Sequence, residues 1–276
     1  MKKILVPTDF SECALAASKF AMELSQLAKS DLHFLHLMKT PVDWVKLPKE
    51  KEKNFPEVLK NIRESKNLLN DLIHRSSLLG VSATQFLAFD SRIENIIGHI
   101  DDHHHDLVVM GSHGSQGLKD KIFGSTSQRV LRNAKVPVLI IKKEIEEPIK
   151  KIAFISEFSE INRATIEYSF AFAQLFSADI ELVSINKLEN DDEKKRIEKE
   201  MDRVITYHTQ NNKINKKIIN KPDIRLGSMD HIKGSKPDLI CMITHGKSGL
   251  MQLFAPSVSE KIASDIQLPI LGLPLL

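Results

Sequence analysis

Glycine and hydroxyl residues between positions 110 and 127 are spaced in a way that suits phosphate binding. An apolar run ending at Met110 is followed by Gly111, His113 and Gly114, and after nine further residues the chain reads Gly124-Ser125-Thr126-Ser127. Glycine lets the backbone approach a ligand without an intervening Cβ, and consecutive backbone N–H groups can cradle an anion. A helix starting near residue 124 would add its dipole. The pattern predicts a triphosphate site without a dedicated lysine; the alternative is a glycine turn followed by a Ser/Thr helix cap.

A second group of residues with binding chemistry ends the first apolar run, in Pro7-Thr8-Asp9. In a doubly wound sheet this strand end adjoins the loop after the fourth strand, so the Asp9 carboxylate can accept hydrogen bonds from a ribose hydroxyl or a purine amino group. The alternative is a helix entry in which Asp9 or Ser11 is the N-cap. The two roles are compatible, and the sequence leaves both open.

The elements that must position these residues alternate between strand and helix. In the first half, strands are predicted over Lys3–Pro7, Leu32–Met38, Val81–Phe89, Leu107–Met110 and Val136–Ile141. Helices are predicted over Ser11–Lys29, Glu57–Leu79, Arg92–His103 and Gly124–Asn133. This alternation predicts an α/β fold with a five-stranded, doubly wound parallel sheet, helices on both faces, and a ligand crevice at the carboxyl ends of the strands.

The second half of the chain repeats the first. Shifted by 148 residues, Phe10-Ser11-Glu12 falls on Phe158-Ser159-Glu160, and shifted by 132 residues, His113-Gly114 falls on His245-Gly246. The shifts differ by 148 − 132 = 16 residues, so the second copy is shorter in its middle. We therefore predict two tandem doubly wound domains, 1–143 and 150–276, joined by a short charged link over Lys143–Pro148.

Composition limits the class of protein. The 276 residues agree with two domains, and the net charge of +3 is too small to predict a nucleic-acid partner. Cys13 and Cys241 form neither a disulfide framework nor a paired-cysteine metal site. The amino terminus lacks a signal-peptide pattern, and no apolar stretch reaches the length of about 18 residues that a membrane span needs. A cytoplasmic protein without a membrane partner is expected.

Together these motifs resemble the universal stress protein family. The resemblance rests on Pro7–Ser11, on Met110–Gly114 with Gly124-Ser125 after the nine-residue gap, and on Val136–Ile140, and it extends to both halves. The glycine spacing resembles that of the family's ATP-binding branch. The resemblance therefore implies that the first half binds ATP, or ADP or AMP, with a divalent cation such as Mg²⁺.

The resemblance also implies roles for the matched residues. Those implied to surround the adenine and ribose are Pro7, Thr8, Asp9, Leu37 and Gly111. Those implied to hold the phosphates are Gly114, Gly124, Ser125 and Thr126. The neighbouring residues Met110, His113 and Ser127 complete the predicted nucleotide site.

The second half departs from this pattern at three positions. Ile243 replaces the first glycine, Pro256 replaces the third, and Glu157 stands in place of Asp9. A β-branched side chain would crowd the ribose, and proline removes one backbone N–H from the phosphate loop. We expect this half to have lost tight ATP binding and to serve as a pairing partner or to hold a different ligand.

The run His103-His104-His105, flanked by aspartates, has the residue types of a metal site. Adjacent histidines on a helix point about 100° apart, so they do not converge on one ion as i, i+4 pairs do. We therefore expect a solvated helix end and no metal site.

The last strand of each half, Val136–Ile141 or Leu268–Leu273, is apolar and is expected at a sheet edge. We predict that these strands pair within the chain to make a pseudo-dimer, which can dimerise further. An unidentified protein partner is also expected.

No catalytic residue is predicted, because the chain has no Walker P-loop, nucleophile elbow or H-E-x-x-H motif. The leading interpretation is an ATP-binding stress-response protein that acts as a nucleotide-dependent switch or sensor. Two alternatives stay open. One is a slow ATPase or autophosphorylating enzyme, and the other is a nucleotide-independent protein-interaction module.

Overall fold

A computed structural model describes residues 1–89, 93–112, 124–156, 158, 163–188, 190–207, 212–243 and 267–274. The elements of the first half are β1 (Lys3–Pro7), α1 (Glu12–Ala28), β2 (Asp31–Met38), α2 (Lys49–Glu52), α3 (Pro56–Leu78), β3 (Ala83–Phe89), α4 (Ile93–His103), β4 (Leu107–Gly111), α5 (Ser125–Asn133) and β5 (Val138–Ile141). Those of the second half are β6 (Lys151–Ile155), α6 (Arg163–Leu175), β7 (Asp179–Asn186), α7 (Asp191–Ile205), β8 (Ile214–Asn220), α8 (Ile224–Ser235), β9 (Leu239–Ile243) and β10 (Ile270–Leu273). The short helix α2 was not predicted.

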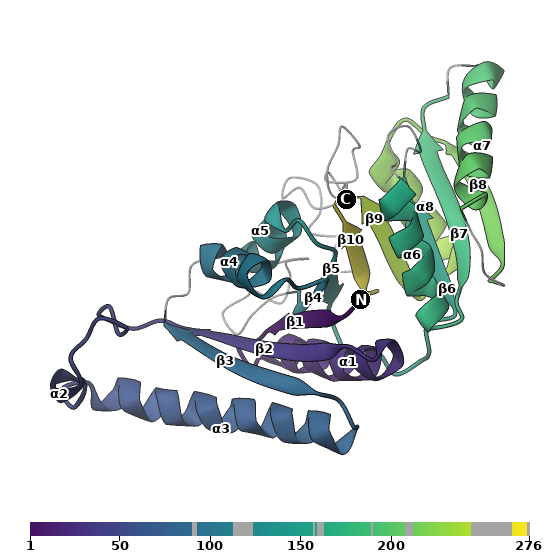
Figure 1. Ribbon diagram of the computed structural model, residues 1–276. Helices are drawn as coiled ribbons and strands as arrows, with labels where there is room; N and C mark the ends of the chain where they lie inside the picture. The colour runs from purple at the N-terminus through teal and green to yellow at the C-terminus, as the bar shows by residue number, and fades with distance from the viewer. Residues whose placement is uncertain are drawn as a thin grey trace.

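A single ten-stranded sheet runs through the molecule in the order β3-β2-β1-β4-β5-β10-β9-β6-β7-β8 (Figure 1). Each half contributes five neighbouring strands, and all pairs within a half are parallel. The predicted doubly wound α/β fold is therefore confirmed.

The two five-stranded parts join through their last strands. β5 and β10 pair antiparallel, with Leu139 opposite Leu271 and Ile140 opposite Ile270. This is the pairing within the chain that the apolar edge strands predicted. It covers two edges that would otherwise expose unpaired N–H and C=O groups.

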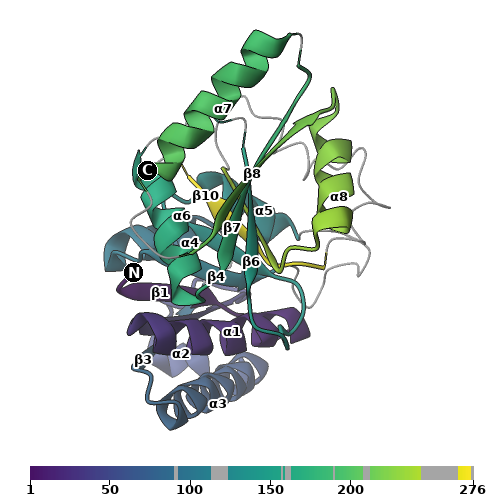
Figure 2. The same ribbon diagram turned by 90° about the vertical axis from the view of Figure 1, so that its right-hand side faces the viewer.

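Helices cover both faces of the sheet, as a turn of the view shows (Figure 2). Buried side chains of α1, α3, α6 and α7 belong to the core on one face, and those of α4, α5 and α8 to the core on the other. Along β1 the side chains alternate between the two faces, since Ile4 and Val6 belong to the first core and Leu5 to the second.

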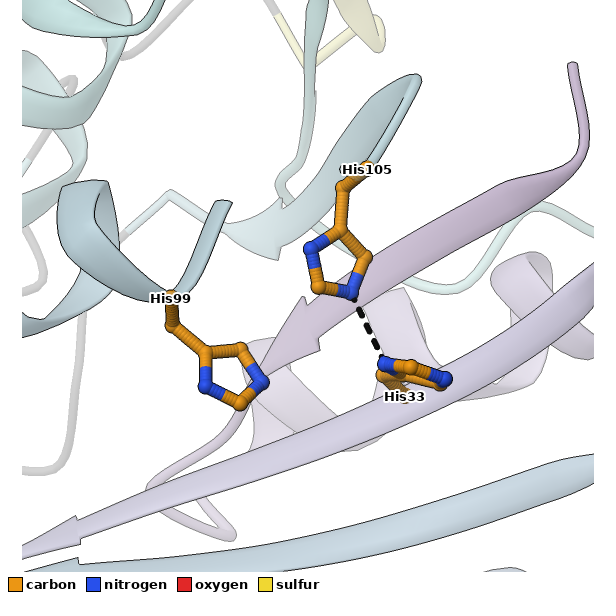
Figure 3. A group of neighbouring side chains, drawn as sticks. All are labelled: His33, His99 and His105. Carbon is orange, nitrogen blue, oxygen red and sulfur yellow. Dashed lines mark hydrogen bonds between the residues drawn. The ribbon is translucent and has the colours of Figure 1, made fainter. Parts of the chain in front are cut away.

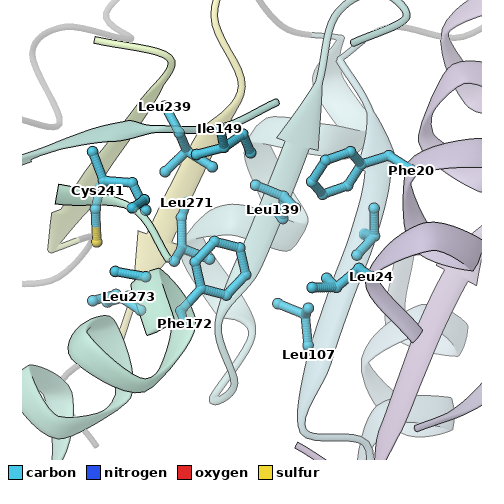
Figure 4. Close-up of a cluster of buried hydrophobic side chains, with 14 of the residues drawn as sticks. Phe20, Leu24, Leu107, Leu139, Ile149, Phe172, Leu239, Cys241, Leu271 and Leu273 are labelled. Carbon is cyan, nitrogen blue, oxygen red and sulfur yellow. The ribbon is translucent and has the colours of Figure 1, made fainter. Parts of the chain in front are cut away.

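The core on the α1 and α6 face is continuous across the junction of the halves (Figure 4). Leu139 of β5, Leu271 of β10 and Phe172 of α6 are all at most 1% exposed. The Phe20 and Phe176 rings stack with their centroids 5.9 Å apart. The junction is thus packed like a domain interior.

The repeat is visible in matching turns. After β1, the Thr8 hydroxyl accepts the Phe10 backbone N–H at 3.1 Å, and after β6 the Ser156 hydroxyl accepts that of Phe158 at 3.2 Å. Phe10 and Phe158 both have left-handed backbones, with φ of 61° and 58°. Such conformations are uncommon for bulky residues, so their recurrence 148 residues apart is a structural signature of the duplication.

A second shared device anchors the first strand of each half. The Asp106 carboxylate accepts the backbone N–H groups of Lys2 and Lys3, the latter at 2.9 Å. The Asp238 carboxylate accepts those of residues 150 and 151, both at 2.8 Å.

None of the helices in the described ranges is both long enough and apolar enough to span a membrane.

Candidate functional site

Asp9 follows the carboxyl end of β1 and is exposed. A ligand crevice is expected at the carboxyl ends of these strands. The Asp9 Oδ1 accepts the backbone N–H of Ser11 at 3.1 Å. The Ser11 hydroxyl in turn accepts the Ala14 N–H at 3.4 Å and caps α1. The predicted helix entry is therefore confirmed, with Ser11 as the N-cap. Nucleotide contact by Asp9 stays a prediction.

The neighbouring residues Pro7 and Thr8 are buried and tie β1 to β2. The Thr8 N–H donates to Leu35 O at 2.9 Å, and His36 Nδ1 donates to Thr8 O at 2.8 Å. These bonds hold the carboxyl ends of β1 and β2 together. Leu37, which follows His36 and was predicted to border the adenine, is half-buried beside them.

Gly111 ends β4 and is held close to α1. A Cβ at this position would lie 2.9 Å from Ala14 N and 2.9 Å from Cys13 C, distances that real Cβ contacts do not reach. Glycine is thus required at this position for the close approach of helix and strand, and contact of Gly111 with a nucleotide stays a prediction. Met110, beside it, is 5% exposed and part of the core.

The amino end of α5 lies after this strand in the chain. Gly124 is its N-cap and makes no side-chain capping bond, while its own N–H donates to Ser112 O at 2.6 Å. Ser125 and Thr126 are exposed in the first turn. Ser127 is different, because its hydroxyl is buried and donates to Gly111 O at 2.8 Å. It fastens α5 to β4.

Several predicted residues lie outside the described part of the chain. They are His113 and Gly114 in the first half, and Glu157 and Pro256 in the second. The described part of the second half includes Ile243, which ends β9, is 6% exposed and pairs with β10.

A hollow of about 890 Å³ lies between α4 and the carboxyl ends of β2 and β3. Three segments line it: residues 39–45 after β2, residues 87–89 of β3, and one side of α4 that includes His99 and Asp102. None of the predicted nucleotide residues within the described ranges lines this hollow.

The expectation of a solvated helix end holds for His104, which is exposed, but not for His105, which is buried. α4 ends at His103, and His104 adopts a left-handed conformation, with φ of 54°. The chain therefore turns, and His105 points into the protein with 3% exposure. There its Nε2 lies 3.0 Å from Nδ1 of His33, and His99 of α4 faces both rings (Figure 3). Treating the run as one straight helix concealed this cluster.

His33 and His99 were not singled out from the sequence. The signal that could have found them is the repeat itself. Under the two shifts, His33 corresponds to Glu181 and His99 to His231, and these two side chains are hydrogen-bonded in the second half. A pair of polar residues at matching interior positions marks a shared buried site.

Comparison with known proteins places this chain in a family. The model of the universal stress protein family matches it twice, over residues 1–142 and 148–273. The chain belongs to the universal stress protein family. Each half of this family member therefore carries a match of its own, in agreement with the duplicated fold.

Relatives of the family agree with this arrangement. Universal stress proteins MJ0531 and MJ0577 of Methanocaldococcus jannaschii are 30% and 28% identical to the chain. The matches cover 53% and 52% of this chain but 85% and 96% of those proteins, so each relative is the size of one half. The crystal structure of a universal stress protein from Archaeoglobus fulgidus covers 99% of this chain and 98% of its own, with a TM-score of 0.73 at 18% identity. That likeness concerns the fold and extends over both halves.

Proposed function

We propose that the first half binds ATP, or ADP or AMP, with a divalent cation, and that the protein is a nucleotide-dependent switch of the stress response. One observation carries the proposal. An exposed carboxylate, Asp9, follows β1, and the amino end of α5, which has no side-chain cap, follows the adjacent strand β4. The glycine spacing between them resembles the family's ATP-binding branch.

The proposed site divides its work between contact and support. The N–H groups in the first turn of α5 have no partner within the helix. Together with the hydroxyls of Ser125 and Thr126 they attract phosphate oxygens. Asp9 accepts hydrogen bonds from the ribose or adenine. Gly111 and Ser127 support the site from behind, since one admits α1 against β4 and the other fastens α5 to the same strand.

The second half is proposed to bind no nucleotide tightly. Ile243 stands where the first half has Gly111, and proline at 256 stands where it has Gly124. Its role in the proposal is to complete the sheet through β10, so that one chain carries one nucleotide. In this proposal, nucleotide binding alters a surface of the first half that a protein partner reads.

Calorimetric titration of the nucleotide-free protein with Mg-ATP tests the proposal. Wild-type protein is expected to bind one ATP per chain. Ser125→Asp keeps a residue that favours a helix start but repels phosphate, so it is expected to weaken binding by about tenfold or more, that is about 1.4 kcal/mol. The neutral Ser125→Asn is the matched control and should bind within a few-fold of wild type.

A second pair of variants compares the halves. Asp9→Ala is expected to weaken ATP binding, and Glu157→Ala, at the corresponding position of the second half, is expected to leave it unchanged. Absence of binding by the wild-type protein would contradict the proposed function. Two sites per chain, or equal effects of the two variants, would contradict the assignment to the first half.

A further inference from the structure

Three histidines from three separate elements converge on the α4 face of the sheet. His33 lies on β2, His99 on α4, and His105 in the turn before β4 (Figure 3). One nitrogen from each ring lies within 4.8 Å of the other two. His33 and His105 are only 9% and 3% exposed. The cluster is therefore interior, and it is built by the fold rather than by neighbours in sequence.

Two ring nitrogens of this cluster have no partner among the described residues. Nε2 of His99 and Nδ1 of His105 are buried and make no hydrogen bond. A buried polar atom without a partner is costly and calls for an explanation. Burial, reinforced by neighbouring imidazoles, lowers the pKa of His99 and of His105 to about 4. Both rings are thus neutral at physiological pH, which is the form that coordinates metals.

The second half provides an internal comparison at the same place in the fold. His33 stands opposite Leu5 in the β1–β2 register, and Glu181 stands opposite the equivalent Ala153. Nε2 of His231, the counterpart of His99, lies 3.1 Å from Glu181 Oε2. The same carboxylate oxygen is also contacted by Lys151 at 3.1 Å and Ser235 at 2.5 Å.

The comparison shows what the first half has changed. In the second half the ring nitrogen at this position is satisfied by a carboxylate, which is itself neutralised by a lysine. In the first half the carboxylate is replaced by His33, and the proline at position 237 by His105. In the second half Nε2 of His231 has a carboxylate partner, although its Nδ1 is without one. The exchange puts three neutral imidazoles in the first half and leaves Nε2 of His99 without a partner.

We propose that His33, His99 and His105 form a binding site for a divalent transition-metal ion, with zinc as the best match. Three imidazoles and an open fourth position are a known zinc arrangement, and imidazole nitrogen suits zinc better than magnesium or calcium. Zinc–nitrogen bonds of about 2.1 Å in a tetrahedral site place the nitrogens about 3.4 Å apart. The present spread, from 3.0 Å to at most 4.8 Å, needs only small side-chain rotations.

Coordination replaces the hydrogen bond between His33 and His105. The proton held between their rings moves to the other nitrogen of the ring that donates it, so both facing nitrogens become ligands. His99 also lines the hollow beside α4. The bound ion links α4 to β2 at the amino ends of β2 and β4. Asp9 and Gly124 lie on the other side, at the carboxyl ends of the strands. The site is thus independent of nucleotide binding.

Competition for Zn²⁺ against a chromophoric chelator, with protein that carries no histidine tag, tests the proposal. Wild-type protein is expected to bind one Zn²⁺ per chain. His99→Leu and His105→Leu fill the same space without a ligand atom. Each is expected to weaken binding by more than about 100-fold, beyond the loss typical of an outer-shell partner. His74→Ala, which removes an exposed histidine on α3, is the control and should bind as wild type does.

X-ray absorption at the zinc edge gives a readout that does not depend on how the variants fold. Three imidazole nitrogens at about 2.0 Å are expected for the wild-type complex. Absence of stoichiometric Zn²⁺ binding, an absorption spectrum without three imidazoles, or equal losses in His74→Ala and His105→Leu would each overturn the proposal. Ser125→Asp should bind Zn²⁺ normally, which separates this site from the nucleotide site.

Discussion

Gly111 is the point at which the close approach of α1 to β4 can be tested by adding one methyl group. In Gly111→Ala the new Cβ would lie 2.9 Å from two backbone atoms of α1, Ala14 N and Cys13 C, and 3.1 Å from Cys13 Cβ. Because two of these neighbours are backbone atoms, no side-chain rotation relieves the contact, and helix and strand must separate. Both elements lie in the packed core of the first half, where such separation costs van der Waals contacts along the whole helix.

Overpacking of a core typically costs about 1–3 kcal/mol. We expect Gly111→Ala to lie in the upper part of this range and to lower the free energy of unfolding by about 2–3 kcal/mol. Urea unfolding followed by circular dichroism measures this change. Gly98→Ala is the control, since nothing lies within 4 Å of a Cβ at that position inside α4. It should stabilise the protein by up to about 1 kcal/mol, through helix propensity alone.

An unfolding free energy for Gly111→Ala equal to that of the wild type would refute this reasoning. It would mean that α1 yields easily and that the glycine is required for another reason. If stability were unchanged but ATP binding were lost, the ligand-approach interpretation of the motif would be the correct one.

Three further predictions follow from the packing and charge of the described residues. Phe172→Ala should lower the free energy of unfolding by about 3–5 kcal/mol, because it empties the junction between the halves; a loss below about 1 kcal/mol in urea unfolding would contradict this. Asp106→Ala and Asp238→Ala should cost similar amounts, about 1.5–3 kcal/mol each, because each removes two charge-assisted bonds to the start of a strand. Unequal thermal shifts would show that the two anchors are not equivalent. Burial lowers the pKa of His231 below 6.5, although Glu181 opposes the shift. The unfolded state then binds more protons than the folded state. The difference in free energy of unfolding between wild type and His231→Leu should therefore decrease as pH drops from about 7 to about 5. A difference that does not depend on pH would refute this.

Much of the architecture could be predicted from local patterns. Apolar runs such as Lys3–Pro7 became strands, and the Gly80 stop signal agrees with the end of α3 at Leu78. The duplication, visible as two shifts of the sequence, predicted a repeated sheet, and the apolar last strands predicted their pairing. These inferences succeed because burial periodicity and strand-edge chemistry depend on residues that are close in sequence.

The roles of individual site residues were harder to assign. Gly111 belongs to a loop motif in the sequence, yet the atoms that require its glycine are in α1, about a hundred residues earlier. Ser127 has the chemistry of a phosphate ligand, but its hydroxyl is turned inward to Gly111 O. A motif specifies which residue types are present, whereas burial and partners decide what each of them contacts.

The sequence by itself determined the α/β class, the tandem repeat and the place of the proposed nucleotide site at the carboxyl ends of the strands. Each of these depends on spacing along the chain. Only the tertiary structure decided the histidine cluster. One left-handed residue, His104, turns His105 inward, and the sheet register brings His33 to it from 72 residues away. Contacts of that kind depend on where separate elements dock, and no local pattern of residues encodes the docking.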